Sequence, residues 1–273
     1  MARDPFYKFL WITPTEIRSA LRLYIALAAT FIFKITRLKT VVLDYPTPCI
    51  FVPGTSLLNI RTRGIYMSVR PVDLVIIAET HEPVTIRWFN PKSGQTVVDI
   101  GAHIGAYALL SSKKGARTIA VEPDRESYSL LKRNADRNRF SVKTLNVALS
   151  DSAGFRNFYL DSGMHTGTSS LEERWSNNTS KILTSVECIT LDQLVKQQGL
   201  EAIDWMIVDV EGHELHVLQG GMLALSMTKK LIIEVSKPTE PKCLGILKAA
   251  GFKIVGSEKQ GEAINWLCQK EKL

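Results

Sequence analysis

Short apolar runs alternate with longer amphipathic segments from Thr96 to the end of the chain. The apolar runs predict strands at residues 97–100, 118–121, 142–147, 155–160, 205–210, 231–235, 252–256 and 263–268. The segments between them predict helices at residues 104–111, 124–138, 191–197, 214–225 and 241–250. Residues 162–184 predict a long polar loop, and a short apolar run at 186–189 leads into the next helix.

Strands that alternate with helices in this way are typical of parallel βαβ units in an α/β fold. The last two predicted strands are joined by a tight turn near Gln260 and Gly261, so they must run antiparallel to each other. We therefore expect a Rossmann-like fold, with a mostly parallel seven-stranded sheet whose last strand is antiparallel.

The chain before this domain divides into two parts. Residues 41–95 form a small lead-in, with strands predicted at 48–53, 57–62 and 65–70 and short helical pieces at 72–78 and 84–89. The turn cluster at residues 90–95 (NPKSGQ) places the start of the main domain, residues 96–273, at Thr96. Residues 1–40 are a basic, apolar extension that is predicted to be helical.

The extension contains eleven uncharged residues at 23–33 (LYIALAATFIF). A helix needs about 20 apolar residues to span a bilayer, so this segment is too short. Basic residues flank it on both sides, which suits a helix lying in the interface of an anionic membrane. The alternative is a helix that packs on the main domain or on a second subunit.

A 273-residue chain that is 45% hydrophobic and 22% charged buries a large core, which excludes a disordered protein. Seven Lys/Arg and two acids give residues 1–40 a charge of +5 out of the total of +7. The main domain therefore lacks the basic stripe that duplex binding needs, and a nucleic-acid partner is not expected. Four dispersed cysteines favour a cytoplasmic location, at the inner face of the membrane if the extension binds lipid.

The strongest motif is an apolar strand that runs into a glycine turn and a helix (VVDIGAHIG, residues 97–105). Gly101 lets the backbone turn sharply and approach a ligand, and Gly105 lets the helix pack close to the strand. Glu122 follows Gly101 by 21 residues and ends the next strand. A carboxylate at that place accepts both hydroxyls of a ribose, so a nucleoside is expected to bind here.

Both a dinucleotide and S-adenosylmethionine suit this geometry. A dinucleotide site needs G-x-G-x-x-G facing a pyrophosphate, but His103 replaces the middle glycine and Asp99 adds a carboxylate that repels phosphate. S-adenosylmethionine carries no phosphate, and acids near the turn attract its amino and sulfonium groups. The residues therefore favour S-adenosylmethionine. An NAD(P)-dependent oxidoreductase and a non-catalytic scaffold are the alternatives.

These residues resemble the FkbM family of methyltransferases. Its first motif is similar to residues 99–107 (DIGAHIGAY), and the further matching segments are residues 120–124 (AVEPD), 146–151 (NVALSD), 190–192 (TLD) and 209–220 (DVEGHELHVLQG). The resemblance covers roughly residues 82–235 and implies a class I methyltransferase fold that methylates hydroxyls on sugars, lipids or polyketides. The family commonly has Asn at His103 and Lys at Ile207, a departure that affects substrate identity.

The residues expected to hold the cofactor come from the glycine turn, the neighbouring strand ends and, by the resemblance, a segment beside the adenine. They are Asp99, Gly101, Ala102, His103, Gly105, Glu122, Pro123, Asn146, Val147, Ala148 and Asp209. Asp209 ends the fourth parallel strand, on the side where ligands bind to open α/β sheets.

Transfer of a methyl group to a hydroxyl benefits from a base that removes the hydroxyl proton. The candidate bases are Asp209, His213 and His165, the last in the loop sequence SGMHTGTSS. Glu211 and Glu234 are expected on the acceptor side. The alternatives are that Glu211 and His213 start a helix and that His165 is a solvated loop residue.

Asp209, Glu211, His213, His216 and Glu234 are all of types that bind metals. No pair of them has the spacing of a metalloenzyme motif, and His216 is expected on the helix surface, so no metal is expected. The expected partner is a small-molecule, glycan or lipid-linked acceptor.

Overall fold

The computed structural model describes residues 42–43, 49–50, 58–62, 64–70, 73, 87–161, 169–173 and 181–271. The chain divides into two compact units, Met1–His81 and Glu82–Leu273. The helix expected within residues 1–40, most of the helical piece at 72–78 and the candidate base His165 lie outside the described residues. Within the described ranges, no helix has the length and apolar character that crossing a membrane requires.

The first unit contains an antiparallel sheet in the order β1-β2-β3-β4. Its strands are β1 (Val42–Leu43), β2 (Cys49–Ile50), β3 (Leu58–Thr62) and β4 (Ile65–Val69). The three strands predicted in this region are confirmed. β1 was not predicted, because two residues are too few to give a hydrophobic pattern.

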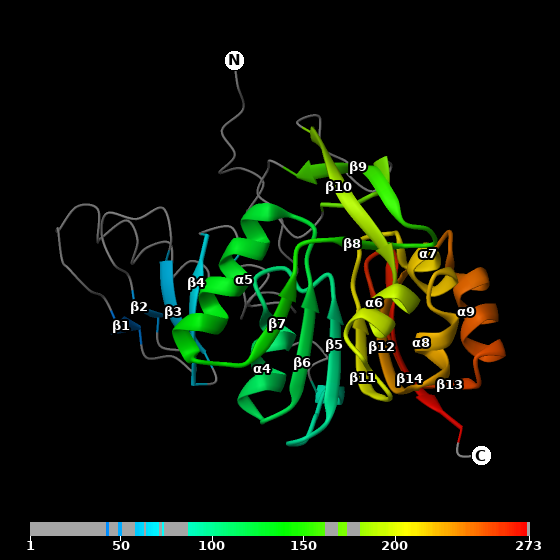
Figure 1. Cartoon of the computed structure of the whole chain (residues 1–273), viewed down its shortest axis with the longest axis horizontal. Coiled ribbons are helices and arrows are strands. Elements are labelled where there is room, and N and C mark those ends of the chain that lie inside the picture. Colours follow the sequence, from blue (N-terminus) through cyan, green and yellow to red (C-terminus); the bar gives the residue numbers. More distant parts are fainter. Residues whose placement is uncertain are drawn as a thin grey trace. The chain divides into compact units, whose positions relative to one another are not determined.

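The second unit is built on a seven-stranded sheet in the order β13-β14-β12-β11-β5-β6-β7 (Figure 1). Its strands are β5 (Thr96–Ile100), β6 (Arg117–Val121), β7 (Val142–Leu145), β11 (Ile203–Val208), β12 (Thr228–Ser236), β13 (Phe252–Gln260) and β14 (Ala263–Lys270). β14 pairs antiparallel with both of its neighbours, and the other strands pair in parallel. The expected mostly parallel sheet with an antiparallel last strand is confirmed.

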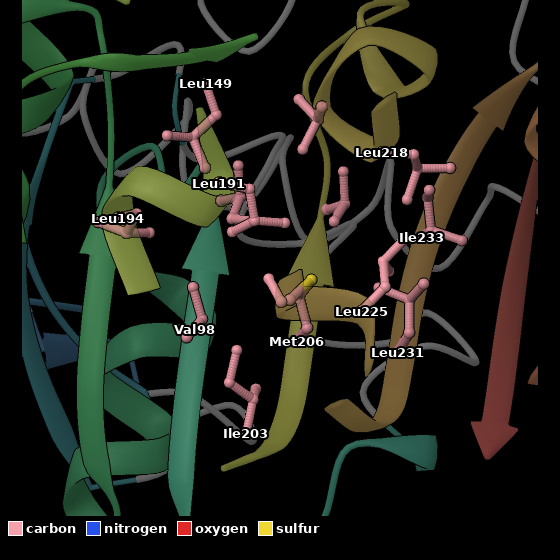
Figure 2. Packing of buried hydrophobic residues seen from close by; sticks show 14 of the residues in the cluster. Val98, Leu149, Leu191, Leu194, Ile203, Met206, Leu218, Leu225, Leu231 and Ile233 are labelled. Atoms are coloured by element: carbon pink, nitrogen blue, oxygen red, sulfur yellow. The ribbon is translucent and has the colours of Figure 1, made fainter. Parts of the chain in front are cut away.

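Helices cover both faces of this sheet. They are α4 (Ala106–Lys113), α5 (Arg125–Asn138), α6 (Leu191–Gln197), α7 (Glu214–Gln219), α8 (Met222–Ser226) and α9 (Glu240–Ala249). Because side chains alternate between the faces of a strand, Val98 and Met206 pack with residues of α6 to α9 (Figure 2). Ala120 instead packs with Ala108 of α4 and Leu131 of α5. The two hydrophobic clusters hold the strand ends in place.

A smaller sheet follows β7 and consists of β8 (Ala148–Ser150), β10 (Lys181–Thr190) and β9 (Gly154–Asp161). β10 pairs in parallel with β8 and antiparallel with β9. The prediction of a single strand at 142–147 is wrong, because the chain leaves the central sheet after Leu145. The side chain of Asn146 makes this turn by donating to the carbonyl oxygens of Glu122 and Pro123, both at 2.9 Å.

The prediction of a loop at 162–184 is wrong for residues 181–184, which belong to β10. Ile182 and Leu183 in this part of the strand are 56% and 57% exposed. A strand that buries neither face shows no alternation of apolar and polar residues, so the sequence pattern gave no sign of it.

The helix predicted at 104–111 begins two residues later, at Ala106. His103 and Gly105 have positive φ angles of 49° and 101°, which interrupt a right-handed helix. A Cβ on Gly105 would lie 2.7 Å from Cδ1 of Leu131, so this glycine also allows α4 to pack close to α5.

The helix predicted at 214–225 is split into α7 and α8 at Gly220 and Gly221. A Cβ on Gly220 would lie 2.2 Å from the carbonyl oxygen of Ser150 in β8. A Cβ on Gly221 would lie 2.6 Å from Cδ2 of Leu191. The paired glycines therefore let both short helices pack directly against β8 and α6.

We expect Gly220→Ala to lower the free energy of unfolding by about 1–3 kcal/mol, because the added methyl overlaps the Ser150 carbonyl oxygen. Gly245→Ala is the matched control, since Gly245 lies within α9 and a Cβ there meets nothing within 4 Å. It should stabilise the protein by about 0.5–1 kcal/mol. Urea unfolding followed by circular dichroism measures both variants, and equal stabilities would contradict the packing of α7 on β8.

Candidate functional site

The glycine turn after β5 lies against the ends of β6 and β11. The N–H groups of Gly101 and Ala102 both donate to the carbonyl oxygen of Val121 at 3.0 Å, which ties the turn to β6. Gly101 has a φ of 81°, and a Cβ there would lie 1.7 Å from the carbonyl oxygen of Asp209. Only glycine fits this position, and its backbone directly contacts the end of β11.

Glu122 follows β6 and is only 6% exposed. Its Oε2 accepts a hydrogen bond from the N–H of His103, and its Oε1 accepts one from the N–H of Asp124, both at 2.8 Å. The glycine turn and the loop after β6 are thus joined through one acidic side chain.

Burial raises the pKa values of the carboxyl groups around the turn. The pKa of Glu122 is raised to about 8, that of Asp99 to about 7 and that of Asp209 to about 6. The nearby charge of Asp209 contributes further to the raised pKa of Asp99. Oδ2 of Asp99 is buried and has no hydrogen-bond partner among the described residues. A cation bound here would favour the ionised carboxylates.

A cavity opens beside the turn. The predicted site residues that line it are Gly101, His103, Glu122, Pro123, Val147, Ala148, Asp209, Glu211 and His213. The predicted residues that do not line it are Asp99, Ala102, Gly105, Asn146 and Glu234. The lining residues outside the predicted set are Ile100, Val121, Leu149, Phe158, Ser169, Leu171 and Val210. Ile100, Val121 and Val210 are sequence neighbours of predicted residues, whereas the smaller sheet and its loop contribute the other four. The described lining contains no lysine or arginine.

The chain makes a second tight turn after β11. Glu211 and Gly212 have positive φ angles of 51° and 97°. The N–H of Gly212 donates to Oε1 of Glu214 at 2.6 Å, and the hydroxyl of Ser170 donates to the carbonyl oxygen of Glu211 at 2.6 Å. Burial raises the pKa of Glu214 to about 7. Glu214, which the sequence reasoning did not single out, therefore stabilises the turn that presents Asp209 and Glu211.

His213 stands immediately before α7 and is 4% exposed. Its Nε2 lies 2.9 Å from the hydroxyl oxygen of Ser150, and its Nδ1 lies 2.9 Å from Oε1 of Glu172. Burial lowers the pKa of the imidazole, and the carboxylate of Glu172 partly opposes that effect. Both ring nitrogens are engaged, which makes His213 less suited to accept a proton from a substrate.

Asp209 also faces two further acids. One carboxylate oxygen from each of Asp209, Glu211 and Glu234 lies within 4.8 Å of the others. Glu234 comes from β12, and its Oε2 accepts a hydrogen bond from Asn265 at 3.4 Å. The structure thus brings the predicted acceptor-side residues together next to Asp209.

A family model described as the methyltransferase FkbM domain matches residues 99–270. The chain belongs to the FkbM methyltransferase family. Together with the strand order, this membership confirms the expected class I methyltransferase fold.

Two further methyltransferases are similar to part of this chain. Hexuronic acid methyltransferase AglP of Haloferax volcanii is 32% identical over 144 residues, which are 53% of this chain and 57% of AglP. 2-O-methyltransferase NoeI of Sinorhizobium fredii is 29% identical over 163 residues, which are 53% of this chain and 65% of NoeI. The match thus spans less than two thirds of either relative. Among solved structures, Trm5b of Pyrococcus abyssi aligns with a TM-score of 0.46 and 12% identity, covering 98% of this chain and 81% of Trm5b.

The raised pKa of Glu122 gives the ligand-free protein a defined pH dependence. Between pH 4.5 and about pH 8, Glu122 is protonated in the folded state but ionised in the unfolded state. The contribution of Glu122 to the free energy of unfolding is therefore fully present below pH 4.5 and is lost as the pH rises through about 8. We expect the melting temperature to fall over this window and Glu122→Gln to flatten the fall. Glu126→Gln is the control, because Glu126 is exposed on α5. If the melting temperature of Glu122→Gln fell with pH as steeply as that of the wild type, Glu122 would not be the group responsible.

Proposed function

We propose that this chain is an S-adenosylmethionine-dependent methyltransferase that O-methylates a hydroxyl of a carbohydrate, lipid-linked or other small acceptor. The observation that carries this proposal is the cavity at the glycine turn, which has three carboxylates and, among the described residues, no basic side chain except histidine. Such a lining attracts a cation and repels a pyrophosphate, which favours S-adenosylmethionine over NAD(P). Membership of the FkbM family supports the same reaction class.

The residues at the turn fit this cofactor. Each oxygen of Glu122 accepts one amide hydrogen bond and has a further lone pair for a ribose hydroxyl. The apolar side chains of Val147 and Phe158 offer a surface for adenine. Asp209, with Asp99 as its charged neighbour, suits the positively charged amino end. When bound, S-adenosylmethionine supplies an electrophilic methyl group on a positively charged sulfur.

The acceptor is proposed to bind next to Asp209, Glu211 and Glu234. An in-line displacement needs the acceptor oxygen on the side of the methyl group opposite to sulfur, so carboxylates that orient the hydroxyl contribute through proximity. Asp209 is the proposed base, because burial raises its pKa to about 6, closer to neutrality than an ordinary aspartate. His165 is proposed as an alternative base.

The proposed acceptor class is a sugar hydroxyl. By their names, AglP methylates a hexuronic acid and NoeI methylates a 2-oxygen. A lipid-linked sugar would also explain residues 1–40. In this extension, basic residues on both sides of the apolar run at 23–33 suit an anionic membrane. We therefore include peripheral attachment at the cytoplasmic face of a membrane in the proposal.

Calorimetry tests the cofactor assignment. We expect binding of S-adenosylmethionine and S-adenosylhomocysteine but not of NAD. Loss of a charge-assisted ribose contact costs about 1.5–3 kcal/mol, so Glu122→Ala should weaken binding about 10- to 150-fold. Glu126→Gln serves as the charge-matched control on α5. Unchanged affinity in a folded Glu122→Ala protein would remove the basis of the proposal.

Turnover measurements test the acceptor side. Deuterated S-adenosylmethionine and cell extract, analysed by mass spectrometry, identify the labelled product and provide the assay. We expect Asp209→Asn to weaken cofactor binding less than Glu122→Ala does, because an amide oxygen can still accept a hydrogen bond from the amino group. It should lower turnover by about 10²–10⁴-fold, the usual contribution of a general base. The same measurement on His165→Ala decides between the two bases, since wild-type turnover at every pH from about 6 to 9 would assign the role to Asp209.

A further inference from the structure

His213 lines both the cofactor cavity and a neighbouring polar groove. In the groove, Nδ1 of His213 lies 2.9 Å from Oε1 of Glu172, and Nε2 of His216 lies 3.8 Å from the same oxygen. The two imidazole rings stack with centroids 4.5 Å apart and planes inclined by 23°. One nitrogen from each histidine and one oxygen of Glu172 all lie within 4.8 Å of one another. Three side chains of types that bind metals thus place one potential ligand atom each close together.

The local structure explains this convergence. His213 stands directly before α7 and His216 lies three residues later, so both project from one face of the helix. Glu172 comes from a distant segment that Ser170 fixes in place. Ser170 exchanges two backbone hydrogen bonds with β9, at 2.8 and 3.1 Å, and its hydroxyl holds the carbonyl oxygen of Glu211. Glu172 is therefore held beside α7 by the backbone around it.

Each histidine is also oriented through its other ring nitrogen. Nε2 of His213 contacts the hydroxyl of Ser150 at 2.9 Å, and Nδ1 of His216 contacts Oδ2 of Asp151 at 3.1 Å. Histidines that bind metals usually have this arrangement, in which a hydroxyl, carbonyl or carboxylate holds the nitrogen that is not coordinated. The two remaining nitrogens are the ones that face Glu172.

We propose that Glu172, His213 and His216 bind a divalent transition-metal ion, with Zn²⁺ as the best match. Two imidazoles and one carboxylate are a common zinc ligand set and leave a fourth tetrahedral position open. Ligand atoms about 2.1 Å from zinc lie about 3.4 Å apart in a tetrahedral site. The two measured distances to Oε1 of Glu172, 2.9 and 3.8 Å, lie on either side of that value.

The groove gives the ion a route from solvent. It is lined by polar side chains of β9, including Arg156, Asn157 and Tyr159, and the side chain of His216 is 37% exposed. The cation Arg156 is paired with Asp151, which offsets its repulsion of a metal. A bound ion would tie the segment that contains Ser169 and Leu171, both lining the cofactor cavity, to the start of α7.

Metal binding by the full-length protein tests the proposal. Protein stripped with a chelator is dialysed against ZnCl₂, and bound zinc is counted by mass spectrometry. We expect one equivalent, and Co²⁺ in its place should give the strong visible absorption of a tetrahedral site. Glu172→Gln and His216→Ala should each weaken zinc binding at least about 10-fold, and Asp151→Asn should weaken it by about 10–100-fold.

Glu173→Gln is the matched control, because Glu173 is the exposed neighbour of Glu172 and is not part of the cluster. It should keep wild-type zinc affinity. Failure to bind zinc, or equal affinity in wild type, Glu172→Gln and His216→Ala, would overturn the proposal. If a variant misfolds by circular dichroism, the cobalt spectrum of the wild type decides, and absence of tetrahedral absorption refutes the site. The metal proposal does not depend on methyl transfer, since binding of S-adenosylmethionine is measured separately.

Discussion

The contact between the backbone of Gly101 and that of Asp209 is the constraint on which the site depends. Parallel pairing places the carboxyl ends of β5 and β11 side by side. Because Gly101 has no Cβ, the backbone that follows β5 can contact the backbone that follows β11. The turn then directs its amides toward β6, where Glu122 receives one of them. The proposed cofactor side and the proposed acceptor side are therefore parts of one backbone arrangement, and a shift in either strand end would move both.

The same arrangement concentrates acids that are buried or half-buried. Asp99, Glu122, Asp209 and Glu214 all have pKa values raised by burial, and each would be easier to bury as an apolar residue. Burying these acids lowers the free energy of unfolding, and a bound cation would raise it again. Ligand binding and stability are therefore linked, and the protein is expected to be most stable when its site is filled.

The sequence allowed the central sheet and the glycine turn beside Glu122 to be predicted, because both depend on local patterns. The glycine turn and Glu122 are each recognisable within one strand–turn–helix unit. Phe158 was missed because pairing of the smaller sheet brings it to the cavity. Glu172 was missed because its segment joins β9 through a bridge between Ser170 and Tyr159, which are distant in sequence. Asn146 was predicted beside the adenine, yet its amide is used to turn the backbone. The sequence showed which residue types the candidate site contains, but it did not show which distant residues each of them contacts.

The smaller sheet also fixes both ends of the connection between β9 and β10. β9 ends at Asp161 and β10 begins at Lys181, and these two residues are direct partners in the antiparallel ladder. The ends of the connection are thus fixed at the distance between neighbouring strands, whatever its length or sequence. Residues 169–173 within that connection also belong to the candidate site, since Ser170 holds the carbonyl oxygen of Glu211 and Leu171 lines the cavity. Changes of length or sequence in the stretches on either side of residues 169–173 would therefore leave both the register of the ladder and these contacts in place.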